Sequence, residues 1–84
     1  MTNPFMRKIV LTAAYQPLST VKLVLSVQVS CLPGNAGNAL FKCGGDTDVP
    51  WIPGEWHDFV GIDLSEIQVK GTPGDLITII GGSR

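Results

Sequence analysis

The alternation of apolar and polar side chains over residues 22–32 constrains the fold of this chain more than any other feature. One set of alternate positions is apolar throughout: Leu23, Leu25, Val27, Val29 and Cys31. The set between them is mostly polar: Val24, Ser26, Gln28 and Ser30. Successive side chains of a β-strand point to opposite faces, whereas a helix repeats every three to four residues. The segment therefore predicts a half-buried strand.

Shorter stretches separated by turn-forming residues predict further strands at 7–14, 39–43, 56–63, 67–70 and 76–80. The last of them is apolar except for Thr78, which predicts burial on both faces. Pro53-Gly54 and Pro73-Gly74 suit the central positions of type II turns. We therefore expect an all-β fold, a single small antiparallel β-sandwich or partly closed barrel of about six strands. Residues 1–84 would form one domain, with 1–6 as an N-terminal arm that is loose or reaches a neighbouring subunit.

The segment 33–38 is rich in turn-forming residues and predicts a hairpin in which 39–43 pairs with 22–32. This hairpin sets the expected distance between the two cysteines. Ala39, Phe41 and Cys43 would then face the core. In that hairpin Cys31 and Cys43 are diagonal neighbours with Cβ atoms roughly 7 Å apart, against about 4 Å in a disulfide. Two free thiols are favoured, and a disulfide remains the alternative if the turn is looser.

The amino-acid composition indicates what kind of surface the folded domain has. Only 15% of the 84 residues are charged, while 44% are hydrophobic, and a small domain has a large surface to keep soluble. This imbalance predicts that other protein covers part of the surface. A net charge of −1 gives no electrostatic basis for nucleic-acid binding. The apolar stretches are too short to cross a membrane and none resembles a secretion signal.

The loop 49–56 carries both tryptophans between prolines, so its contacts would be pre-organised. Tryptophan is enriched at interface hot spots, and it also stacks on sugar rings. We expect at least one tryptophan to cap the core. The candidate interface residues are Phe41, Trp51, Ile52 and Trp56, together with Arg7 and Lys8, which would face the acidic residues between 46 and 66 of a neighbouring subunit.

Catalysis and metal binding have little support in the residues. His57 is the sole histidine, and no strand–turn–helix pattern is present to hold a nucleophile beside it. Asp46, Asp48 and Glu55 could share a hard cation, but the other ligands of a calcium loop are missing. We expect no enzyme activity, no cofactor and no metal.

Several segments together resemble a known group of proteins. They are Asn38-Ala39-Leu40-Phe41, Pro53-Gly54-Glu55, Asp63-Leu64-Ser65-Glu66-Ile67-Gln68-Val69 and Gly74-Asp75-Leu76-Ile77-Thr78-Ile79. In this order they resemble small β-structured virion proteins of tailed bacteriophages, of the head-decoration or cement type. The resemblance implies a non-catalytic subunit that binds other virion proteins, above all the major capsid protein, and that self-associates as a trimer or dimer. It would be made in the host cytoplasm. A tail, neck or fibre-attachment component and a small carbohydrate-binding module are the alternatives.

Overall fold

The computed structural model describes residues 3–45 and 47–83. They form eight strands and one turn of 3₁₀ helix, η1. The strands are β1 (Asn3–Val10), β2 (Gln16–Pro17), β3 (Val24–Cys31), β4 (Ala39–Cys43), β5 (Val49–Trp51), β6 (Trp56–Asp63), β7 (Ile67–Lys70) and β8 (Leu76–Ser83), with η1 (Leu64–Glu66) between β6 and β7. No helix in this part of the chain is long and apolar enough to span a membrane.

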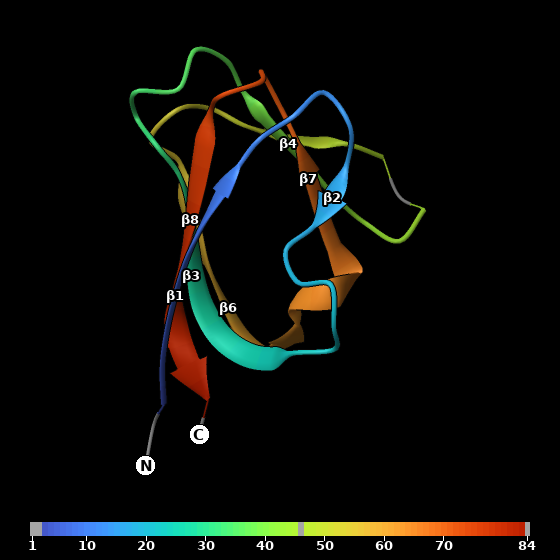
Figure 1. The fold of residues 1–84 in the computed structure, drawn as a ribbon, viewed down its shortest axis with the longest axis vertical. Helices are drawn as coiled ribbons and strands as arrows, with labels where there is room; N and C mark the ends of the chain where they lie inside the picture. Colours follow the sequence, from blue (N-terminus) through green and yellow to red (C-terminus); the bar gives the residue numbers. More distant parts are fainter. Residues whose placement is uncertain (1–2, 46, 84) are drawn as a thin grey trace.

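The strands form two four-stranded antiparallel sheets that face each other (Figure 1). Sheet A has the order β1-β8-β3-β6, and sheet B has the order β2-β7-β4-β5. This connectivity is that of a jelly roll, in which strands consecutive in the sequence mostly alternate between the two sheets. The all-β sandwich expected from the sequence is thus confirmed, with eight strands where we expected about six.

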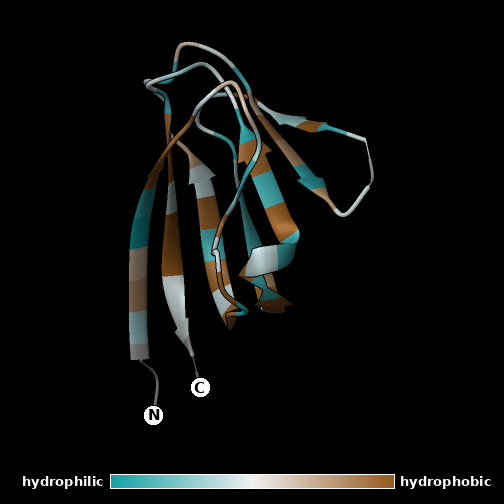
Figure 2. Ribbon diagram, turned by 45° about the vertical axis from the view of Figure 1, so that its right-hand side comes forward, coloured by the Kyte–Doolittle hydropathy of each residue, from teal (hydrophilic) through white to brown (hydrophobic). Residues whose placement is uncertain are grey.

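The core lies between the sheets and is built by the alternation in the sequence. Along β3, every second side chain is buried, and Ile77 and Ile79 of β8 are likewise buried beside it. The period is visible as alternating brown and teal bands along strands in Figure 2. Sheet B contributes Ala39, Phe41, Trp51 and Val69 to this core.

Three strands, β4, β6 and β7, begin and end at the predicted residues, and β8 begins at the predicted residue but continues beyond residue 80 to Ser83. The first predicted strand lies nearer the N-terminus, because β1 covers Asn3–Val10. Residues 3–6 of the expected arm thus pair with β8, and residues 1–2 lie outside the described part. The expected two-face burial of 76–80 is wrong, because Ile80 on the outer face of sheet A is 50% exposed. The short strands β2 and β5 were missed.

The expected hairpin between β3 and β4 is also wrong. β3 pairs with β6 and β8, and β4 pairs with β5 and β7. Residues 33–38 cross from one sheet to the other, held by the loop before β8. The Asn35 side chain exchanges two hydrogen bonds with the backbone of Leu76, and the buried Asp75 accepts from the backbone N–H groups of Ala36 and Gly37.

Four glycines in the described ranges have a positive φ, which other residues rarely adopt, and one of them, Gly44, lies in the loop after β4. Gly54 and Gly74 have φ of 91° and 95°, as expected at the third position of the two type II turns. Gly61 has φ of 62° and lies where the register between β3 and β6 shifts, in a β-bulge.

Candidate functional site

A cavity of about 520 Å³ opens between the two sheets, at the edge where β5 and β6 lie. Its lining is mainly apolar: Phe41, Val49, Trp51, Phe59, Ile62 and Ile67. Lys42, Cys43, Asp63 and Glu66 complete the lining. β5 has three residues and β6 has eight, and Phe59 and Ile62 of β6 are only partly buried. The cavity is therefore the part of the sandwich interior that sheet B leaves uncovered.

Aromatic rings from three strands meet at this cavity. Phe41 and Trp51 are stacked, with ring centroids 3.8 Å apart and an interplanar angle of 26°. The ring of Phe59 lies nearly parallel to that of Trp51, at 12° and 6.3 Å. The imidazole of His57 meets Trp51 edge-on at 4.7 Å. Trp51 is thus the central ring of the cluster.

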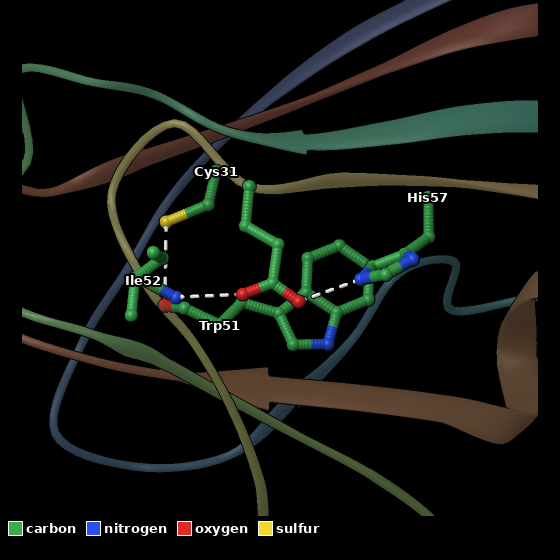
Figure 3. Close-up of polar contacts among 5 residues, drawn as sticks. Cys31, Trp51, Ile52 and His57 are labelled. Atoms are coloured by element: carbon green, nitrogen blue, oxygen red, sulfur yellow. Dashed lines mark hydrogen bonds and ion pairs between the residues drawn. The ribbon is translucent and has the colours of Figure 1, made fainter.

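The turn after β5 fixes the direction of Trp51 (Figure 3). It is closed by a hydrogen bond from Glu55 N–H to the carbonyl of Ile52 at 2.9 Å. The Glu55 side chain accepts from Ile52 N–H at 3.0 Å. The Cys31 thiol donates to the carbonyl of Trp51 at 3.8 Å, a weak contact. These bonds tie the end of β5 to the end of β3.

Glu55 also contacts His57, whose Nε2 lies 2.6 Å from Glu55 Oε2 (Figure 3). This hydrogen bond, aided by the one from Ile52 N–H, lowers the pKa of Glu55 below its ordinary value. Both side chains are partly exposed to solvent. The hydrogen bonds of Glu55 stabilise the turn and hold His57 beside Trp51. In the described ranges no group of three His, Cys, Asp or Glu side chains is placed to hold a metal ion. Asp46, one of the three residues considered for a cation, lies outside those ranges.

The two carboxylates at the cavity come from the end of β6 and from η1. Asp63 caps η1 and accepts three hydrogen bonds at Oδ1, from Leu23 N–H, Ser65 N–H and the Ser65 hydroxyl. These bonds, first the one from Leu23, lower the pKa of Asp63. Asp63 is therefore anionic at neutral pH, and its Oδ2 takes no part in these three bonds. Glu66 is exposed.

Lys42 lines the cavity, but its ammonium group lies over the ring of Tyr15. The Lys42 ammonium lies 4.3 Å from the ring centroid of Tyr15, and that of Lys70 lies 4.7 Å from the same ring. The Tyr15 hydroxyl donates to Asp48. Desolvation and this bond to a carboxylate raise the pKa of Tyr15 to about 12. These contacts of Tyr15 connect the segment before β2 to β4, to β7 and to the loop between β4 and β5.

The predicted interface residues do not share one surface. Phe41 and Trp51 are buried and line the cavity, whereas Ile52 and Trp56 are exposed. Arg7 is bound within its own chain, because its guanidinium donates to the carbonyl of Leu18 at 2.8 Å. Lys8 is exposed on the outer face of sheet A. Phe59, Ile62 and Ile67 were not predicted as lining residues, although the alternation expected within 56–63 would place His57 and Phe59 on one face.

Both cysteines are free thiols, Cys31 buried and Cys43 exposed. Cys43 was expected to face the core. It instead ends β4 beside the open cavity, where β5 no longer covers the strand.

Comparison with known proteins supports the fold alone. No protein-family model matches the chain, and no curated protein matches it. Among solved structures, it is similar to the solution NMR structure of a de novo designed double-stranded β-helix. The TM-score is 0.52 with 20% sequence identity, over 98% of this chain and 100% of the designed one. The match agrees with the jelly-roll arrangement of the two sheets.

Proposed function

We propose that this protein is a structural subunit of a bacteriophage virion, a capsid decoration or cement protein that stabilises the assembled shell through protein–protein contacts. The proposal begins from the sequence resemblance to small phage virion proteins. It requires a folded domain with an apolar surface that other protein covers, and no catalytic step.

The observation that carries the proposal is the outer face of sheet A. Six large apolar side chains project from it and are at least half exposed: Met6, Val10, Val24, Trp56, Val60 and Ile80. Met6 on β1 is 77% exposed and Val60 on β6 is 83% exposed. These are the two edge strands of the sheet, where an unprotected apolar side chain favours association.

This face carries few charged groups that would favour its exposure to solvent. Its central positions on β3 and β8 include Ser26, Gln28, Ser30 and Thr78, which are uncharged. The charged residues at the described outward positions are Lys8 and Asp58, and Asp63 lies opposite Val24 at the last position of β6, where η1 begins. A hollow of about 250 Å³ lies at Met6 and Ile80 and could receive a side chain of another subunit. Such a face resembles the apolar centre of a subunit interface more than a free surface.

The outer face of sheet A would serve contacts between copies, as a dimer or trimer, or contacts with the major capsid protein. We test the first by measuring the mass in solution across a dilution series, using size-exclusion chromatography with light scattering. The wild type should form a dimer or trimer at micromolar concentration. Val60→Asp should shift the mass to that of a monomer with an unchanged circular dichroism spectrum, because a buried unpaired carboxylate opposes association.

Ile52→Asp is the matched control, because Ile52 is exposed but lies in the turn after β5 rather than on this face. Its mass should equal that of the wild type. A wild type that stays monomeric at every concentration, or a Val60→Asp variant with an unchanged mass, would contradict association through sheet A.

Two alternatives have weaker support. A carbohydrate platform made of both tryptophans requires them on one surface, and Trp51 is buried while Trp56 lies on the outer face of sheet A. A tail, neck or fibre-attachment component would use the same apolar face. Its copy number per virion, low for a tail or neck component and high for a decoration protein, separates these two roles.

A further inference from the structure

The cavity between β4, β5 and β6 has the size and lining of a small-molecule site. Its volume of about 520 Å³ falls within the roughly 300–1,000 Å³ of ligand pockets, which are mostly apolar with a few polar groups. The aromatic cluster supplies three ring systems, and the nearly parallel rings of Trp51 and Phe59 favour a flat ligand.

A β-strand from another protein fits this site less well. Such a strand would pair with the free edge of β6 and direct alternate side chains toward the cavity. The bulge at Gly61 lies between Phe59 and Ile62, the two β6 residues whose side chains line the cavity. Because a bulge interrupts a regular ladder, the pairing would be broken beside the cavity. A compact molecule avoids this problem.

The charges at the cavity select the sign of the ligand. The lining carries two carboxylates, from Asp63 and Glu66, and one ammonium, from Lys42, which lies against Tyr15. Lys22 attracts the Asp63 carboxylate only weakly, since it is the last of the causes that lower the pKa of Asp63. A cation is attracted both by carboxylates and by the faces of aromatic rings. An anion would meet more negative than positive charge there.

We propose that this cavity binds a flat apolar compound that bears an ammonium group, with the ring system against Trp51 and Phe59 and the cation between Asp63 and Glu66. The site is distinct from the outer face of sheet A and does not depend on a role in a virion.

The test is an NMR titration of the ¹⁵N-labelled protein with 1-naphthylmethylamine, and separately with the anion 1-naphthylacetate. The two tryptophan indole N–H signals, assigned with Trp51→Phe and Trp56→Phe, form an internal comparison, because only Trp51 lines the cavity. The amine should shift the Trp51 signal with a dissociation constant of about 1 mM or tighter and leave the Trp56 signal in place. The anion should bind at least about tenfold more weakly, because it meets like charge.

Two variants connect the binding to the named groups. Glu66→Gln removes an exposed carboxylate without disturbing the core, and it should weaken amine binding by about two- to fivefold. Asp58→Asn is its control, since Asp58 lies at an outward position of sheet A, and it should leave the affinity unchanged. Both variants should keep the wild-type spectrum of the free protein.

Three results would overturn the proposal. They are no shift of the Trp51 signal up to the solubility limit of the amine, equal affinities for amine and anion, and equal effects of Glu66→Gln and Asp58→Asn. A shift of the Trp56 signal without one of Trp51 would place the ligand on sheet A and would also overturn it. None of these outcomes bears on self-association, which is measured in the absence of ligand.

Discussion

Trp51 and Trp56 lie on either side of the Pro53-Gly54 turn, but Trp51 is buried between the two sheets whereas Trp56 is exposed on the outer face of sheet A. Trp51 is 5% exposed within the aromatic cluster, and Trp56 is 55% exposed on the outer face of sheet A. The turn carries the chain from β5 in sheet B to β6 in sheet A. One short segment therefore supplies an aromatic side chain to the cavity and another to the proposed interface.

The two tryptophans should differ in their effect on stability. Trp51→Ala removes the ring stacked on Phe41 and should lower the free energy of unfolding by about 3–5 kcal/mol, as for other buried aromatic residues. Trp56→Ala should change it by about 0.5 kcal/mol or less in the monomer. Urea unfolding at concentrations where each variant is monomeric measures both. Equal losses would mean that the aromatic cluster does not depend on Trp51.

Gly81 should tolerate no side chain. A Cβ there would lie 2.1 Å from the carbonyl oxygen of Ser26 and 2.7 Å from the Cα of Val27. These are backbone atoms of β3, so the strands would have to move apart, and Gly81→Ala should cost about 1–3 kcal/mol. Gly34→Ala is the control, because no atom lies within 4 Å of its Cβ position. Thermal unfolding of the two variants gives the comparison, and similar midpoints would refute the close approach of β3 and β8.

Asp75 should hold the crossing between the sheets. Asp75→Ala leaves the N–H groups of Ala36 and Gly37 without their acceptor and should destabilise the fold by about 1–3 kcal/mol. The exchange of these two amide hydrogens with solvent should accelerate more than that of the amides in β3. The exposed Asp58, changed to Ala, provides the reference. Unchanged exchange at Ala36 and Gly37 would show that the crossing is held by other contacts.

Asp63 should make stability depend on acid pH. Its pKa is lowered in the folded state, first by the hydrogen bond from Leu23 N–H. Its contribution is therefore fully present above the pKa of an unfolded aspartate, about 3.9, and is lost as the pH falls through the lower folded value. The urea midpoint of the wild type should exceed that of Asp63→Asn at pH 6, and the difference should shrink toward pH 2. A constant difference over this range would contradict the assignment.

Local patterns in the sequence predicted the parts of the fold that each segment specifies alone. The alternation over 22–32 identified the buried face of β3, and the Pro-Gly pairs located Gly54 and Gly74 at positive φ. β2 and β5 were missed because two or three residues, one of them a proline in each, are too few for a period to be visible. Phe41 was expected on the core side of its strand and a tryptophan was expected to cap the core, and both Phe41 and Trp51 were also named as interface candidates. That the two rings line a cavity was not predicted.

The sequence by itself determined which side chains share a face of each strand, because that depends only on the geometry of an extended backbone. It did not determine which strands pair, because backbone hydrogen bonds are the same for every partner. The choice between a β3–β4 hairpin and a jelly roll was made by contacts far apart in the chain, such as Asn35 with Leu76 and Asp75 with Gly37. The cavity follows from the same choice, since it exists only where the three residues of β5 face the eight residues of β6.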